Sequence, residues 1–243
     1  PDYYRDRIWD AEVEETALGT TITFGLHSPD GDQGYPGNAD ITVSYTLTPD
    51  NCLKLDYHMV SDADTIANFT NHVYFNLGGY KSGSALDQKV WIDADYFTAT
   101  DANSIPTGEL VAVKGTPMDF TEMKPIGRDI QEDYQALKYG NGYDHNWALN
   151  HPAGELSLSA KAEDEKTGRT MEVYTDLPGV QFYTANSLKT ERGKNHAVYT
   201  PRCGYCFETQ YFPDAINQPE FSSPVIKAGE EYKTTTIYKF GVK

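Results

Sequence analysis

The sequence is poor in basic residues and contains no long apolar run. It carries 20 Lys and Arg against 36 Asp and Glu, which gives a formal net charge of −16 over 243 residues. A field of that sign repels a phosphate backbone and an anionic lipid surface alike. No apolar stretch approaches the ~20 residues that a membrane-spanning helix requires. We therefore expect neither a nucleic acid nor a membrane as a partner.

Cysteine is also scarce. The three cysteines cannot all form disulfides with one another, and Cys203 and Cys206 make a single Cys-x-x-Cys motif. A structural zinc site needs further ligands at suitable spacing, and the strand-like residues after Cys206 argue against a redox loop. The polar residues 1–7 have no signal-peptide character. These features favour a cytoplasmic protein with reduced thiols, and they predict no metal site.

Sequence motifs for the common cofactors and nucleophiles are missing too. The chain has no glycine-rich phosphate loop, no pair of histidines at helical spacing and no nucleophile elbow. We therefore expect no cofactor, so any chemistry has to come from side chains alone.

Aromatic and turn-forming residues are abundant, with 18 Tyr, 10 Phe and 3 Trp beside 20 Gly and 13 Pro. This composition is typical of short strands joined by tight turns. Alternating polarity predicts strands at 7–13, 20–26, 41–47, 52–60, 89–98, 155–162, 170–175, 180–184, 204–210 and 234–240. Turns are predicted at 105–108 and 124–127, and one short helix at 128–137. The expected fold is all-β: a large antiparallel β-sandwich with almost no helix, formed as one domain over residues 1–243.

Three places combine polar or reactive groups with glycine or proline punctuation. His72 lies in the aromatic run 70–79 (TNHVYFNLGG), where it is either a core imidazole held by neighbouring amides or an acid or base. Asp144 precedes His145 shortly after two glycines, a pattern that also occurs in ordinary turns. Gln181 lies in a predicted strand among aromatics, where it is either a satisfied core amide or a binding residue.

A fourth candidate is Glu208. Alternation puts it on one strand face with Cys206 and Gln210, so its carboxylate is either exposed on a wet face or held in a site. A histidine and a glutamate together can deliver a proton to one oxygen and remove a proton from another, without metal or cofactor. Aromatic faces and amide side chains suit a neutral polyol or sugar.

Several motifs together make the chain resemble the aldose 1-epimerase (galactose mutarotase) family. They are SPDGDQGYPG at 28–37, NFTNHVYFNLGG at 68–79, IPTG at 105–108, GYDHN at 142–146, PGVQFYT at 178–184, ETQ at 208–210, PDAINQP at 213–219 and AGEEY at 228–232. The resemblance extends over nearly the whole chain.

The resemblance implies a fold, a reaction and roles for individual residues. The fold is the family's antiparallel supersandwich, and the reaction interconverts the α and β anomers of free aldoses, so the partner is a small-molecule sugar. His72 matches the general acid that protonates the ring oxygen, and Glu208 matches the general base that takes the proton of the C1 hydroxyl. Asp144 and Gln181 match residues that hold sugar hydroxyls.

The family pattern also has an upstream part, with an Asn-Arg pair and a Leu-His-Gly-Gly motif, that this sequence does not match. We therefore expect the N-terminal part to exist, as a separate fragment of the same protein or as residues outside this sequence, and to complete the fold. The main alternative to an enzyme is a non-catalytic sugar-binding β-sandwich module or an inactive truncated paralogue. An epimerase for sugar phosphates would need clustered Lys and Arg, which the net charge of −16 disfavours.

Overall fold

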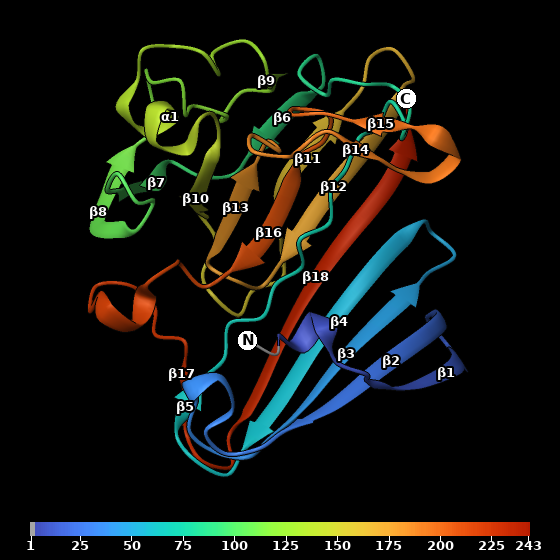
Figure 1. The fold of residues 1–243 in the computed structure, drawn as a ribbon, viewed down its shortest axis with the longest axis vertical. Coiled ribbons are helices and arrows are strands. Elements are labelled where there is room, and N and C mark those ends of the chain that lie inside the picture. Colours follow the sequence, from blue (N-terminus) through green and yellow to red (C-terminus); the bar gives the residue numbers. More distant parts are fainter. Residues whose placement is uncertain (1–2) are drawn as a thin grey trace.

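The computed structural model describes residues 3–243, and nearly all of its regular structure is antiparallel β-sheet (Figure 1). The larger sheet has nine strands in the order β1 (Asp10–Thr16), β2 (Gly19–Ser28), β3 (Ala39–Leu47), β4 (Cys52–Ser61), β18 (Glu231–Val242), β12 (Arg169–Thr175), β11 (Ser157–Glu163), β6 (Lys89–Ile92) and β9 (Lys124–Pro125). The smaller has five, in the order β16 (Cys206–Gln210), β13 (Gly179–Tyr183), β10 (Asp144–Ala148), β7 (Tyr96–Thr100) and β8 (Pro106–Ala112).

The remaining elements are short. Two-stranded pairs join β14 (Glu191–Arg192) to β15 (Val198–Tyr199) and β5 (Thr65–Ile66) to β17 (Val225–Ile226). The one α-helix of the described residues is α1 (Gln135–Gly140), and 3-10 turns lie at Tyr4–Asp6, Asp32–Gly34, Lys194–His196 and Ala215–Asn217. None of the helices in residues 3–243 is long and apolar enough to cross a membrane.

The five-stranded sheet packs its aromatic face on one half of the nine-stranded sheet. Trp147, Phe182 and Phe207 come from its three neighbouring strands and are fully buried. Across the interface, the Tyr238 hydroxyl of β18 donates to the Phe207 carbonyl at 2.8 Å. Buried aromatic pairs in offset or edge-to-face contact add about 0.5–1.5 kcal/mol each beyond the area they bury. The all-β sandwich expected from the sequence is therefore confirmed, and this core fixes the five-stranded sheet in place.

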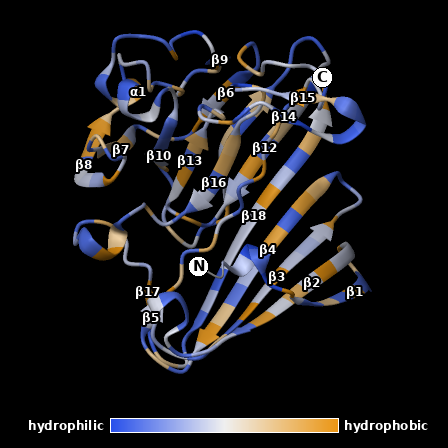
Figure 2. Ribbon diagram, in the orientation of Figure 1, coloured by the Kyte–Doolittle hydropathy of each residue, from blue (hydrophilic) through white to orange (hydrophobic). Residues whose placement is uncertain are grey.

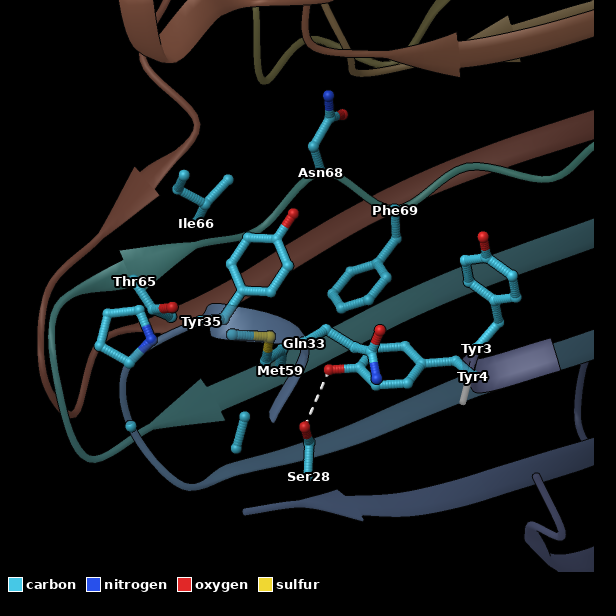
Figure 3. A pocket seen from close by; sticks show the side chains of 13 residues that line it. Tyr3, Tyr4, Ser28, Gln33, Tyr35, Met59, Thr65, Ile66, Asn68 and Phe69 are labelled. Carbon is cyan, nitrogen blue, oxygen red and sulfur yellow. Dashed lines mark hydrogen bonds between the residues drawn. The ribbon is translucent and has the colours of Figure 1, made fainter. Parts of the chain in front are cut away.

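The other half of the nine-stranded sheet is open. Strands β1–β4 fan out beyond β18 with no second sheet over them (Figure 1), and residues of both polarities alternate along β4 and β18 (Figure 2). Trp9, Phe24, Val43 and Tyr45 are only partly buried there, and they line a hollow of about 620 Å³. A neighbouring hollow of about 490 Å³ is lined by Met59, Phe69, Tyr35 and other residues in Figure 3, where the Tyr4 hydroxyl and the Ser28 hydroxyl lie 2.9 Å apart.

Several local predictions are wrong. The turn predicted at 124–127 begins with β9, which pairs with β6. The strand predicted at 89–98 is two strands in different sheets, because the chain bends at 93–95, where the Asp93 amide bonds to the Ser159 carbonyl at 2.9 Å. The turn predicted at 105–108 instead begins β8, which pairs with β7. The helix predicted at 128–137 is wrong over 128–134, where the chain forms turns and bends; α1 begins at Gln135 and extends to Gly140, and it ends where Asn141 adopts a left-handed φ of 51°.

Candidate active site

Three adjacent strands of the smaller sheet present polar side chains on the face turned away from the aromatic core. Gln181 in β13 lies directly opposite Asn146 in β10 and Glu208 in β16. In the next row, Tyr183 lies opposite Asp144 and Cys206. Because side chains alternate along a strand, both rows project from the same face of the sheet. Residues separated by more than 60 positions are thereby brought within reach of one another.

His72 reaches this face from a non-repetitive segment. Residues 67–74 have no regular structure, and the segment is tied to the start of β16 by a pair of backbone hydrogen bonds between Phe75 and Tyr205, at 2.7 and 3.0 Å. The flanking amides anchor it further. Asn71 Oδ1 accepts from the Tyr238 hydroxyl at 2.9 Å, and Asn76 Nδ2 donates to the Cys203 carbonyl at 2.8 Å. The asparagines around His72 therefore hold the backbone that positions the imidazole.

The His72 ring lies between a carboxyl and a thiol. Its Nε2 is 3.3 Å from Glu208 Oε1, and its Nδ1 is 3.3 Å from Cys206 Sγ. The Tyr74 and Tyr183 rings flank it, with centroids 5.1 and 5.8 Å from the imidazole. The His72 side chain is 52% exposed and that of Glu208 only 12%. The imidazole is thus at the rim of the site, and the carboxyl is on its floor.

Asp144 and Gln181 form the other side of the same hollow. Gln181 Nε2 donates to Asp144 Oδ1 at 2.8 Å, and Gln210 Nε2 donates to Gln181 Oε1 at 3.4 Å. The hollow has a volume of about 320 Å³ and is lined by His72, Tyr74, Asp144, Gln181, Tyr183, Glu208, Gln210 and Pro213. All four residues singled out from the sequence (His72, Asp144, Gln181 and Glu208) therefore meet in one place.

Burial changes the acidity of this site. Burial and, to a smaller extent, the nearby Asp144 carboxylate together raise the pKa of Glu208 to about 7. Burial likewise raises the pKa of Asp144, against the opposing effect of the Gln181 hydrogen bond. The pKa of the Cys206 thiol is also raised by burial. A carboxyl group with a pKa near 7 can both accept and release a proton at neutral pH, as acid–base catalysis requires.

His145 is not part of the site, although it is the sequence neighbour of Asp144. The two side chains alternate to opposite faces of β10, and His145 lies in the core at 1% exposure. Its Nδ1 accepts from the Asp144 backbone amide at 3.1 Å, and burial lowers its pKa to about 4. Such an imidazole stays neutral at physiological pH and is a packing residue.

Sequence reasoning did not assign four of the residues that line the hollow. Alternation had already placed Gln210 on the strand face of Glu208 without giving it a role, and the same strand parity could have found Tyr183 beside Gln181. Tyr74 and Pro213 lie outside regular strands, where no periodic signal exists.

The sequence of the chain is similar to those of a known protein family. Residues 3–239 match the family model described as aldose 1-epimerase. The galactose mutarotase of Homo sapiens is 42% identical over 236 residues, which are 97% of this chain and 66% of the human protein. The aldose 1-epimerase of Haemophilus influenzae is 38% identical over 234 residues, which are 90% of this chain and 64% of that protein. The chain thus spans about two thirds of the length of these relatives.

Solved structures agree with the sequence match. The crystal structure of galactose 1-epimerase from Lactobacillus acidophilus NCFM superposes with a TM-score of 0.85 at 28% identity, over 98% of this chain and 67% of that one. The aldose epimerase homologue from C. elegans gives a TM-score of 0.85 at 24% identity, over 98% of this chain and 69% of that one, which shows the shared fold.

Proposed function

Because this chain belongs to the aldose 1-epimerase family, we propose that it interconverts the α and β anomers of free aldoses such as galactose and glucose. The observation that carries the proposal is the meeting of the His72 imidazole and the Glu208 carboxyl, 3.3 Å apart, at a polar hollow. One group is suited to giving a proton and the other to taking one, and a sugar that enters between them would contact both.

In the proposed mechanism, His72 Nε2 delivers a proton to the ring oxygen while Glu208 takes the proton of the C1 hydroxyl. The bond between C1 and the ring oxygen breaks, which leaves an open-chain aldehyde. Rotation about the C1–C2 bond presents the other carbonyl face. Closure then reverses both proton transfers, so the protein returns to its starting state and no cofactor is consumed.

Asp144 and Gln181 are proposed to hold sugar hydroxyls. Their mutual hydrogen bond of 2.8 Å leaves the second carboxylate oxygen of Asp144 as an acceptor. The Tyr74 and Tyr183 rings beside His72 offer apolar surface for the C–H faces of a pyranose.

Polarimetry of freshly dissolved α-galactose or α-glucose tests this function. We expect the chain to accelerate mutarotation, and His72→Ala and Glu208→Ala each to lose about 10²–10⁴-fold in rate, since each removes one proton-transfer partner. Glu109→Gln, on the exposed part of β8, serves as the control and should retain the wild-type rate. Near-wild-type rates in either site variant would refute the assignment. Sugar binding without acceleration in the wild type would favour a non-catalytic binding module.

The pH dependence of the rate follows from the raised pKa of Glu208. A general base must be ionised, so kcat/KM should rise as the pH increases through about 7. The rate of spontaneous mutarotation at each pH is subtracted as background. A kcat/KM that is flat between about pH 5 and about pH 8 would exclude Glu208 as the base.

We also propose that residues 1–243 act as one domain, and that a separate N-terminal fragment of the same protein covers the open face of β1–β4. One apolar cluster runs through both sheets, and it has Trp9, Val43 and Tyr45 at its uncovered edge. An unpartnered apolar face of this kind marks an interface. Native mass spectrometry of protein purified from its own cells should find a bound second species, whereas a lone species near 27.2 kDa would refute the proposal.

A cytoplasmic location is proposed from the thiols. Cys52, Cys203 and Cys206 are all unpaired, and free thiols persist in reducing compartments. Fractionation of the source cells, with the protein detected by antibody, tests this.

A further inference from the structure

We propose that the candidate site also binds a zinc ion, with His72, Cys206 and Glu208 as ligands, and that the bound ion blocks the reaction. The sequence predicted no metal site because Cys203 and Cys206 lack further ligands at suitable spacing. Folding brings Cys206, the nearby Glu208 and the distant His72 together. Glu208 is two residues after Cys206 in β16 and projects from the same face of the strand. His72 comes from the segment that bridges to the start of β16 through Phe75 and Tyr205.

The first support is geometric. One ligand atom from each of the three residues can be chosen so that all lie within 4.8 Å of one another. Zinc with bonds of about 2.0–2.3 Å in a tetrahedron needs its ligand atoms about 3.3–3.8 Å apart. Small side-chain rotations therefore close the triad around an ion. The 52% exposed imidazole of His72 gives the ion a route from solvent, and water can complete the tetrahedron.

The second support is electrostatic. The hollow contains the carboxyls of both Glu208 and Asp144, and no Lys or Arg is among its described lining residues. Two carboxyl groups close together in a desolvated place raise each other's free energy when ionised. A divalent cation removes that repulsion, so the two carboxylates together attract a metal ion more strongly than one carboxylate would.

The donor set identifies the class of metal. A thiolate, an imidazole and a carboxylate form the mixed sulfur, nitrogen and oxygen set that suits zinc and its spectroscopic substitute cobalt. Magnesium and calcium prefer oxygen ligands and should not compete. As the ion binds, the Cys206 thiol releases its proton to solvent and the sulfur forms the metal bond.

The consequence for activity rests on the proposed function. His72 and Glu208 are the proposed acid and base, and an ion that coordinates both would remove both from proton transfer. Zinc and a sugar undergoing reaction therefore exclude each other. The rate of anomer exchange would then respond to the concentration of free zinc.

Cobalt titration tests the site independently of activity. Adding Co²⁺ to the reduced protein should produce a thiolate-to-cobalt charge-transfer band in the near ultraviolet and the visible bands of tetrahedral cobalt, and zinc should displace both. Cys206→Ser should abolish the charge-transfer band, whereas the matched variant Cys203→Ser should keep it, since Cys203 lies outside the triad. No band in the wild type, or a band lost in Cys203→Ser and kept in Cys206→Ser, would overturn the proposal.

Affinity gives a second measure. Replacing a group that only supports a metal ligand costs about 10–100-fold in metal affinity, so loss of the Cys206 ligand should weaken zinc binding at least that much. Zinc should inhibit polarimetric mutarotation with the affinity that the cobalt competition reports. A cobalt band in a protein with no mutarotase activity would support the metal site and refute the proposed function. Mutarotase activity in a protein with no cobalt band would support the proposed function and refute the metal site.

Discussion

The two faces of strands β10, β13 and β16 are built from alternate residues of the same three segments, yet they have little in common. One face carries Trp147, Phe182 and Phe207, which are all 0% exposed. The other carries Asp144, Gln181 and Glu208, which are partly buried around a polar hollow. The pleat of a strand is the whole reason for the separation. As a result, a rigid aromatic core lies one residue away from the groups that we propose to exchange protons.

We infer a division between the two faces, in which the inner face provides stability and the outer face provides the proposed activity. Aromatic residues on the inner face hold the sheet in place, so the carboxyls on the outer face need not contribute stability. The raised pKa of Glu208 indicates that ionising this carboxyl in the folded protein is unfavourable. If the division holds, substitutions on one face should change stability, and those on the other should change activity and pH dependence.

The sharpest test compares neighbours on β13. Phe182 contacts Trp147 at 5.9 Å and Phe207 at 5.2 Å between ring centroids, so Phe182→Ala leaves a large cavity and should cost about 3–5 kcal/mol in free energy of unfolding. Gln181→Ala removes amide hydrogen bonds on the other face and should cost about 1 kcal/mol. Urea unfolding followed by tryptophan fluorescence measures both.

The affinity for galactose provides a second comparison of the two β13 variants. Gln181→Ala should weaken the affinity for galactose, whereas the fraction of Phe182→Ala that remains folded should bind galactose with the wild-type affinity. Equal stability losses at the two positions would show that the outer face also holds the fold together, and the proposed division would fail.

A second test uses the stability of Glu208→Gln against pH. The folded protein holds a proton on Glu208 up to pH about 7, whereas the unfolded chain loses it near 4.5. Wild-type stability should therefore fall as pH rises through this window and stay level outside it, by up to about 3 kcal/mol from this group. Glu208→Gln cannot ionise and should become the more stable protein above pH about 7.

The difference between the two proteins isolates this effect, because other titrating groups are common to both. Glu109→Gln again serves as the matched control and should track the wild type at every pH. A Glu208→Gln protein that is less stable than the wild type at alkaline pH would mean that the carboxylate stabilises the fold.

The sequence allowed most strands to be predicted, because alternation is a local signal. Strands β3, β4, β12 and β13 lie within a residue or two of their predicted bounds. Where the chain changes sheets at 93–95, alternation continues through the bend, so one strand was predicted instead of two. The order of strands in a sheet depends on contacts between distant segments, and no local pattern encodes it.

The candidate site could likewise be predicted only in part from the sequence. Glu208 and Gln181 could be placed on a strand face by counting, but their direct opposition depends on the register between β13 and β16. His72 lies in a segment without regular structure, so no periodicity predicts where its ring points. Its placement depends on side-chain hydrogen bonds such as that from Tyr238 to Asn71, which form only in the folded molecule.

A further prediction concerns a hydroxyl pair that links the inner face of β16 to the larger sheet. Thr209 and Thr236 are both 0% exposed, and their hydroxyls lie 2.5 Å apart. Thr209→Val alone leaves the Thr236 hydroxyl buried without this partner, and it should cost about 1–3 kcal/mol in free energy of unfolding. The double variant Thr209→Val with Thr236→Val removes both hydroxyls while keeping the shape, and it should recover most of that loss. Chemical denaturation of the wild type, the two single variants and the double variant completes the cycle. A double variant that loses the sum of both single losses would show that hydroxyls on the inner face contribute to stability on their own, and that apolar packing is not the only stabilising contact there.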